Sequence, residues 1–325
     1  MQTGAIANER SSALAWQATL AITALTVISL QVVGLGFHGN ISAETIALIS
    51  VYFCLLVSYR FIRRDRGIAC MVIGIGQLTV VTVMGLMLTY AASTVPLPYR
   101  DFEFHAIDRW LGFEREAYLA VVERSDTLQK ILGFAYDSLL AQTLLLFIAT
   151  AAVRRVDRLQ SYIIAFVIAV IATAVIASFL PAANAVIHVD KMPTDVSILP
   201  DGRHSYFPTL EGLRAGTLRS INLNAMEGLI SFPSFHTTAA ILLVWALWPI
   251  PVLRFFLLPL NFLLIASTPL CGAHYVIDII GGAAVALAAI LVTWRLTRSP
   301  RASRSLVNQE PDAISALKVP SEAAG

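Results

Sequence analysis

Charged residues are scarce in this chain of 325 residues, at 14 % of the sequence, whereas hydrophobic residues make up 57 %. A soluble domain has about 25 % charged residues. The composition therefore excludes an ordinary soluble globular protein and is typical of a membrane protein with several spans. The formal net charge of +2 is too small to indicate a nucleic-acid partner.

Cysteines are also few. Cys54, Cys70 and Cys271 lie far apart, inside or at the end of apolar runs, and no CxxC pair occurs. The sequence therefore predicts neither structural disulfides nor a zinc site.

The polar residues 1–12 precede an apolar run that is too long for the core of a signal peptide and lacks a small-residue cleavage site. We expect a retained membrane anchor there.

Long apolar runs occupy most of the chain. A spanning helix needs about 20 mostly apolar residues, and we expect eight such spans, at residues 13–37, 43–62, 68–93, 131–152, 159–180, 232–250, 252–271 and 274–295. The sequence therefore predicts an all-α polytopic membrane helix bundle of about eight spans.

Arginine clusters indicate which ends of the spans are cytoplasmic. They follow the second, fourth and eighth runs, at residues 60–66, 154–158 and 295–304. Because basic residues concentrate in cytoplasmic loops, we expect both termini in the cytoplasm. The long loops at 94–130 and 181–230 then face outward. Short loops and the lack of appended domains favour a bacterial inner membrane, with the outer loops in the periplasm.

Four segments are expected along the chain. They are a cytoplasmic N-terminus at 1–12, three spans with an outer segment at 13–130, a core of five spans at 131–298, and a disordered tail at 299–325. The outer segment contains "FHAIDRWLGFEREAYLAVVE", whose apolar residues recur at helical spacing. It predicts an amphipathic helix on the membrane surface, to which we assign Asp108 and Arg109.

Two histidines stand at the outer ends of neighbouring spans. "SFPSFHTTAA" places His236 in the first turn of the sixth run, and "GAHYVID" places His274 at the start of the eighth. Asp278 follows His274 by four residues, a spacing that puts both on one face of a helix. A carboxylate there can fix the imidazole tautomer and stabilise its cation. An ionised Asp inside a span costs about 2.5–3.5 kcal/mol, so it seldom occurs without a partner.

The start of the sixth run also predicts an anion site. Pro233 suits the first helical position, and the following backbone N–H groups, with the Ser234 hydroxyl, can bind phosphate oxygens. Arg214 and Arg219 precede it and can add bidentate contacts. We infer that His274 attacks phosphorus and His236 protonates the leaving oxygen, after which a phosphohistidine passes its group to water or an alcohol.

Other interpretations of these residues stay open. A lone histidine at a span end is commonly interfacial, and a His/His/Asp set can bind a metal. Intramembrane charge also occurs in transporters, although this charge lies near the outer rim. Tyr136 and Asp137 fit either structure or substrate contact. We assign no role to the remaining histidines, which lie in loops or at interfaces: His38, His105, His188 and His204.

"FPSFHT" and "AHYVIDIIGG" resemble the second and third motifs of the type 2 phosphatidic acid phosphatase superfamily. The "PSFH" form, and "HYVID" followed by "GG", resemble the branch that contains inositol phosphorylceramide synthase. The strong similarity covers about residues 227–285. It implies His274 as nucleophile, Asp278 as its partner, His236 as acid and Ser234 as a phosphate contact, with no metal or cofactor.

The chain departs from the family pattern in three places. Phe235 replaces the glycine of the second motif, and Ser267-Thr268 stands where the third motif begins Ser-Arg. The first motif, a lysine with a downstream Arg-Pro, has no match. Lys191 with Arg203, or Arg214, are the candidates to replace its phosphate-binding residues.

The sequence therefore predicts a membrane enzyme acting on a lipid phosphate or phospholipid at the extracytoplasmic face. Lipid phosphatase and headgroup phosphotransferase share all of these catalytic residues. They differ in the acceptor, which is water or an alcohol such as inositol. The alternative is a non-enzymatic lipid transporter or lipid-binding protein on the same scaffold.

Overall fold

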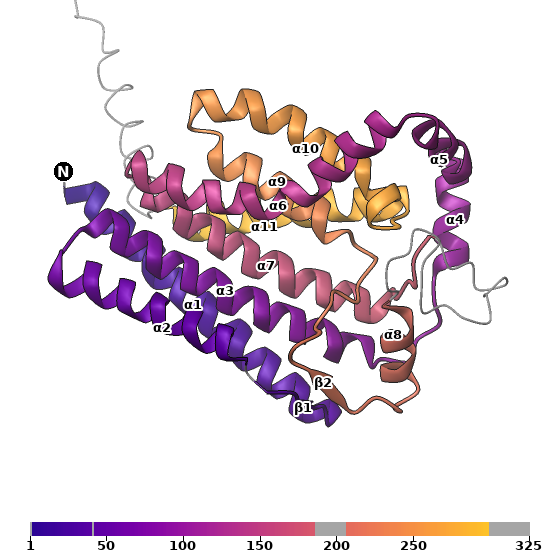
Figure 1. The fold of residues 1–325 in the computed structure, drawn as a ribbon, viewed down its shortest axis with the longest axis horizontal. Coiled ribbons are helices and arrows are strands. Elements are labelled where there is room, and N and C mark those ends of the chain that lie inside the picture. The colour runs from indigo at the N-terminus through magenta and orange to yellow at the C-terminus, as the bar shows by residue number, and fades with distance from the viewer. Residues whose placement is uncertain (1, 41, 186–205, 299–325) are drawn as a thin grey trace, which may run out of the picture.

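The computed structural model describes residues 2–40, 42–185 and 206–298. Within these ranges the chain is almost entirely helical, which confirms the predicted all-α membrane bundle (Figure 1). The tail at 299–325 lies outside the described residues. In chain order the elements are α1 (Gln2–Val33), β1 (Gly36–His38), α2 (Ala43–Val57), the π-helix η1 (Ser58–Ile62), α3 (Arg66–Ser93), α4 (Asp101–Trp110), α5 (Arg115–Glu123), α6 (Asp126–Ala152), α7 (Val156–Phe179), α8 (Phe207–Arg214), β2 (Ser220–Asn222), α9 (Phe235–Leu247), α10 (Pro251–Cys271) and α11 (Val276–Thr297).

Seven helical segments of the described chain are long and apolar enough to cross a membrane, so the chain is an integral multi-pass membrane protein. They lie in α1, α2 with η1, α3, α6, α7, α10 and α11. The predicted span at 232–250 is shorter than expected. It forms α9, whose 13 residues extend about 20 Å against a hydrocarbon core of about 30 Å.

The shortness of α9 has a local cause at each end. Ser234 caps the helix at its start, so the residues before it, including Pro233, stay outside the helix. At its other end, Pro251 lies in the first turn of α10 and begins that helix at once. The run from Ser231 to Ile250 is thus apolar enough for a span, but only its middle part is helical.

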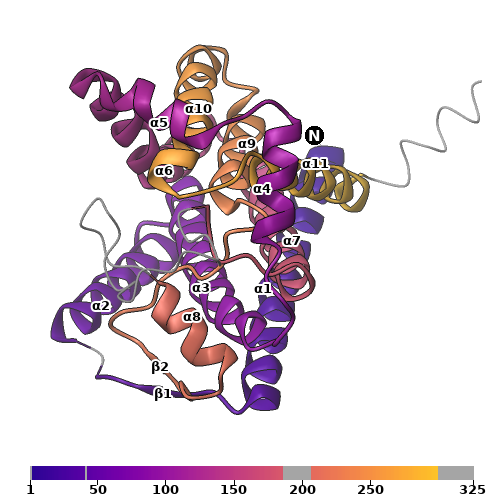
Figure 2. The same cartoon turned by 90° about the vertical axis from the view of Figure 1, so that its right-hand side faces the viewer.

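The long helices lie side by side, with α4, α5, α8 and the two strands gathered at one end of the bundle (Figures 1 and 2). The two ends of the described chain meet at the opposite end, where the Arg10 guanidinium donates a hydrogen bond of 3.1 Å to the Arg298 carbonyl. The arrangement places the motif-bearing starts of α9 and α11 at the end that carries α4 and α8.

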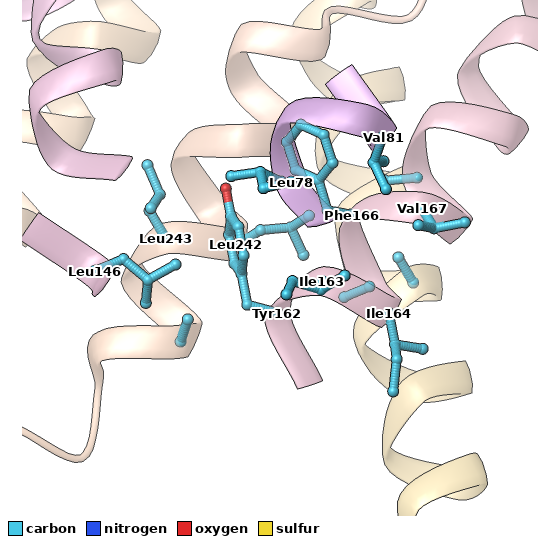
Figure 3. Close-up of a cluster of buried hydrophobic side chains, with 14 of the residues drawn as sticks. Leu78, Val81, Leu146, Tyr162, Ile163, Ile164, Phe166, Val167, Leu242 and Leu243 are labelled. Atoms are coloured by element: carbon cyan, nitrogen blue, oxygen red, sulfur yellow. The ribbon is translucent and has the colours of Figure 1, made fainter. Parts of the chain in front are cut away.

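The core of the bundle surrounds α7, which packs against α1, α3, α9 and α11. Tyr162 and Ile163 of α7 are buried against Leu242 and Leu243 of α9 and Leu78 of α3 (Figure 3). By contrast, α2 buries none of its residues, although its sequence is apolar. The apolar surface of α2 fits contact with lipid rather than with protein.

A small sheet joins the end of the first predicted span to the second of the predicted outer loops. β1 pairs with β2 in parallel, with Gly36 opposite Ser220 and His38 opposite Asn222. The pairing fixes the connection after α1 to the segment that leads into α9. Strands of three residues carry too little pattern to be recognised in a sequence.

The outer segment after α3 forms two short helices, α4 and α5. One side of α4 is exposed, with Phe102 at 77 % and Trp110 at 84 % exposure. The other side buries Asp101, Phe104 and Asp108. Asp108 and Arg109 both lie in α4, the helix predicted for this segment, but Asp108 is on its buried side and is only 4 % exposed.

Candidate active site

His274 and Asp278 form a buried pair. Nδ1 of His274 lies 3.0 Å from Oδ2 of Asp278, which is completely buried. The same carboxylate oxygen accepts hydrogen bonds from the Ser231 hydroxyl at 2.9 Å and the Tyr275 N–H at 3.0 Å. A carboxylate can only accept hydrogen bonds. The contact therefore places the imidazole proton on Nδ1 and leaves Nε2 as the basic, nucleophilic nitrogen.

The His274–Asp278 contact arises from a helix cap, not from a shared helical face. α11 begins at Val276 with Tyr275 as its N-cap, so His274 precedes the helix. The Asp278 side chain accepts a hydrogen bond from the N-cap N–H, as in a capping box. This conformation places the carboxylate next to the imidazole. Ala273, before the histidine, has a φ of 52°, a left-handed conformation that turns the chain toward α11.

His236 stands across from this pair in the first turn of α9. Its ring stacks on Tyr136 of α6, with centroids 4.3 Å apart and planes at 22°. The Tyr136 hydroxyl lies 3.4 Å from Nδ1 of His236. The ring centroids of His236 and His274 are 6.4 Å apart. Two imidazoles, one from the first turn of α9 and one from the segment just before α11, thus face a common space.

That space is a cavity of about 540 Å³. Both histidines line it, together with Ser231 and Phe235 from the α9 motif. From there the cavity extends between α3, α6 and α7, where its wall is largely apolar. A cavity that joins two imidazoles to an apolar interior suits an amphipathic ligand.

Ser234 lies beside the cavity rather than on its wall. Its side chain is wholly buried and accepts a hydrogen bond of 3.4 Å from the Thr237 N–H, as an N-cap does. The N–H groups of Phe235 and His236 are in the first helical turn and have no intrahelical partner. Both residues line the cavity. The backbone donors of the motif, more than its hydroxyl, are available to an anion there.

The predicted arginines are placed away from the two histidines. The Arg214 guanidinium donates to the carbonyls of Val95 and Leu97 and stacks over Tyr99 at 4.2 Å. Arg219 is exposed, and no lysine or arginine of the described ranges lines the cavity. Lys191 and Arg203, like His188 and His204, fall outside the described residues.

Two carboxylates of α4 accept hydrogen bonds from Tyr275 and the start of α11, next to His274. Sequence reasoning missed both contacts. Asp108 accepts hydrogen bonds from the N–H groups of Val276 at 2.8 Å and Ile277 at 3.0 Å, so it caps α11 from a different helix. Asp101 accepts from the Tyr275 hydroxyl at 3.1 Å. The signal in the sequence was an acidic residue on the inward face of an amphipathic helix.

Asp101 also binds the chain that follows α7. It accepts hydrogen bonds from the N–H groups of Ala183 at 2.8 Å and Asn184 at 3.1 Å. Burial raises the pKa of Asp101 to about 6, although these hydrogen bonds favour the charged form. Burial likewise raises the pKa of Asp108. Both carboxylates are thus less hydrated than they would be on a helix at the membrane surface.

These features define a multi-pass helical membrane protein with a buried His–Asp pair and a second histidine facing one cavity. A comparison with protein families matches residues 102–292 to the PAP2 superfamily, from α4 to α11. The match covers more than half of the chain, so the protein belongs to the PAP2 superfamily, whose members are generally phosphatases and phosphotransferases. No curated protein and no solved structure matches the chain.

Proposed function

We propose that this protein is a lipid phosphatase or headgroup phosphotransferase that works through a phosphohistidine. The observation that carries the proposal is the buried contact of 3.0 Å between His274 and Asp278, with His236 across the same cavity. A histidine whose Nδ1 is held by a carboxylate has its Nε2 free to attack. The second histidine, across the cavity, supports a role for it as general acid.

The reaction proceeds in two displacements at phosphorus. Nε2 of His274 forms a bond to phosphorus while the bond to the leaving oxygen breaks, and His236 gives that oxygen its proton. In the second step His236, now neutral, takes a proton from water or an alcohol such as inositol. The new oxygen binds phosphorus as the bond to Nε2 breaks. Asp278 stabilises the imidazolium that His274 becomes between the steps.

Phosphate oxygens are bound at the start of α9 in this proposal. The N–H groups of Phe235 and His236 supply hydrogen bonds and the positive end of the helix dipole. Ser234 holds that turn in place through its cap to Thr237. Lys191, Arg214 and Arg219 stay candidates for further phosphate contacts in a substrate complex, and Arg214 would have to leave its carbonyl partners to reach one.

A lipid phosphate or phospholipid is the substrate that the cavity favours. Its wall beyond the histidines is formed by side chains such as Leu86, Leu139 and Val170. Burying an acyl chain against them yields about 0.8 kcal/mol per methylene group. A soluble sugar phosphate would leave this surface uncovered. The inositol phosphorylceramide synthase-like branch is part of the proposal, resting on the "PSFH" and "HYVID" forms.

The test is release of phosphate or headgroup from a panel of lipid phosphates and phospholipids by purified protein in maltoside detergent with EDTA. The His274→Ala variant is assayed beside the wild type. A phosphoryl label on the protein that is labile in acid and stable in base reports phosphohistidine. We expect release that survives EDTA and is lost in the variant. Release abolished by EDTA would point instead to a metal on the same residues. Lipid binding or flux that persists in His274→Ala, without release by the wild type, would favour a transporter.

We also propose that the site opens to the extracytoplasmic side of a bacterial inner membrane. Arg154, Arg155 and Arg158 border the turn between α6 and α7, at the end of the bundle opposite α4 and α8. Single cysteines introduced near Arg124 and Thr297, in a cysteine-free background, test the orientation. An impermeant maleimide applied to intact cells should label the first and spare the second.

A further inference from the structure

An acidic residue, Glu227, lines the same cavity as the two histidines. Glu227 lies between β2 and α9, and its backbone N–H donates a hydrogen bond of 3.2 Å to the Tyr90 hydroxyl. The Thr209 hydroxyl donates to Oε1 of Glu227 at 3.2 Å. Among the described residues Oε2 accepts no hydrogen bond, and no cation pairs with the carboxylate. An acidic group is an unexpected lining for a site that binds a phosphate anion.

Aromatic rings line the cavity together with Glu227. They come from α6, α7 and the starts of α8 and α9, as Tyr136, Phe166, Tyr206 and Phe235. The face of an aromatic ring attracts a cation through its quadrupole, and rings around a carboxylate are the usual surroundings of a bound ammonium group. The cavity thus combines the two features that recognise an organic cation.

A buried hydroxyl on the cavity wall has no partner in the described protein. Thr173 of α7 is 4 % exposed, lines the cavity, and its Oγ1 makes no hydrogen bond. A buried polar atom without a partner costs about 1–3 kcal/mol. A ligand that carries a hydrogen-bond donor or a bridging water would remove that cost. This observation is independent of Glu227 and also points to a ligand in the cavity.

We propose that the cavity selects a phosphodiester lipid whose headgroup carries an ammonium, with Glu227 as its counter-ion. The inference rests on the proposed function and names its substrate class. The phosphoryl group lies between the histidines and the ammonium reaches Glu227 among the aromatic rings. The ammonium neutralises a carboxylate that would otherwise repel the phosphoryl oxygens. A phosphomonoester dianion brings no such charge.

A primary and a quaternary ammonium share this chemistry and differ in their contacts. A primary ammonium can donate hydrogen bonds to Glu227, whereas a quaternary one depends on the aromatic faces. Phosphatidylethanolamine and phosphatidylcholine supply the two forms. A neutral polyol headgroup could also donate to Glu227, but it would leave the carboxylate charge unbalanced in a largely apolar cavity.

The experiment measures diacylglycerol release from lipids with identical short acyl chains, in maltoside detergent. The substrates are phosphatidylethanolamine, phosphatidylcholine, phosphatidylinositol, phosphatidylglycerol and phosphatidate. We expect one of the ammonium lipids to have the highest kcat/KM, and Glu227→Gln to lower that value about tenfold or more. The same variant should change kcat/KM for phosphatidylglycerol less than about threefold. Glu123→Gln removes the same charge at an exposed position on α5 and should alter neither kcat/KM value.

Two outcomes would overturn the inference while leaving the proposed function intact. One is a preference for phosphatidate, phosphatidylglycerol or phosphatidylinositol over both ammonium lipids. The other is an equal loss on all lipids in Glu227→Gln. If the wild type cleaves none of them, with or without inositol as the acceptor, the proposed function fails. Thermal shifts of His274→Ala with short-chain phosphatidylethanolamine or phosphatidylglycerol, with and without Glu227→Gln, then decide the inference by binding alone.

Discussion

The backbone N–H of Ser234 donates a hydrogen bond of 3.0 Å to the backbone carbonyl of Asp278. A second bond of 2.8 Å runs from the Thr238 hydroxyl to the carbonyl of Gly282. The start of α9 and the first turns of α11 are therefore one rigid unit, although more than 40 residues separate them in the chain. The distance between His236 and His274 is set by these backbone contacts.

Gly282 is the residue that permits this approach. A Cβ at position 282 would lie 2.3 Å from the Ser234 carbonyl oxygen and 3.1 Å from Cβ of Thr237. Because backbone cannot yield as a side chain can, Gly282→Ala should separate the helices. We expect activity to fall about 100-fold or more and the thermal midpoint to drop.

Gly133→Ala is the matched control for that prediction. It lies inside α6 and a Cβ there meets nothing within 4 Å, so we expect unchanged activity and about 0.5–1 kcal/mol of added stability. The prediction for Gly282 is wrong if the two variants behave alike.

Asp278→Asn should abolish most of the activity without unfolding the protein. The amide is similar in size and its oxygen can still accept from Ser231 and Tyr275, but it neither fixes the His274 tautomer nor balances an imidazolium. We expect kcat to fall about 10²- to 10⁴-fold, with KM nearly constant. Steady-state kinetics and circular dichroism measure the two effects. A kcat within threefold of wild type would remove Asp278 from the mechanism.

Asp108 should act as a positioning residue. Asp108→Ala removes the acceptor of two N–H groups at the start of α11, which costs about 1–2 kcal/mol of stability. We expect a lower kcat with a smaller change in KM, because His274 precedes that turn. Compared with Asp108→Ala, Asp108→Asn should restore part of the stability and part of kcat. Glu103→Gln is the control on the exposed side of α4, where the ion pair with Arg100 is open to solvent and contributes little to stability.

Asp101 should make stability depend on pH. Its folded pKa of about 6 lies above the ordinary value of 3.8, so the folded protein binds more protons than the unfolded chain between these values. Stability at this site therefore rises as pH falls from 7 to 4. The unfolding free energy of the wild type relative to Asp101→Asn should increase by up to about 3 kcal/mol over that range. Thermal unfolding in detergent at fixed ionic strength gives the comparison, and a flat difference would contradict it.

The composition, the long apolar runs and the two histidine motifs were enough to predict a helical membrane bundle. The same motifs predicted the superfamily. Apolar length and motif spacing depend on consecutive residues, so both can be recognised in a sequence without knowledge of the tertiary structure. The length of α9 was not predictable from hydropathy, since it depends on the cap at Ser234 and on Pro251.

The contribution of α4 could not be predicted either. Asp108 is 168 residues from the N–H group of Val276 that it caps, and no local pattern reports that pairing. The same limit applies to Arg214, whose charge suggested phosphate binding. Its tertiary contacts instead direct it to the carbonyl of Val95.

The sequence by itself determined that this chain enters the membrane many times and carries a His, His and Asp set near one rim. Only the tertiary structure decided which groups surround that set. Packing placed Asp101 and Asp108 behind it, Tyr136 against His236, and Glu227 in its cavity. The physical reason is that helix formation and membrane insertion depend on nearby residues, whereas a cavity forms only where side chains distant in sequence fail to fill the space between packed helices.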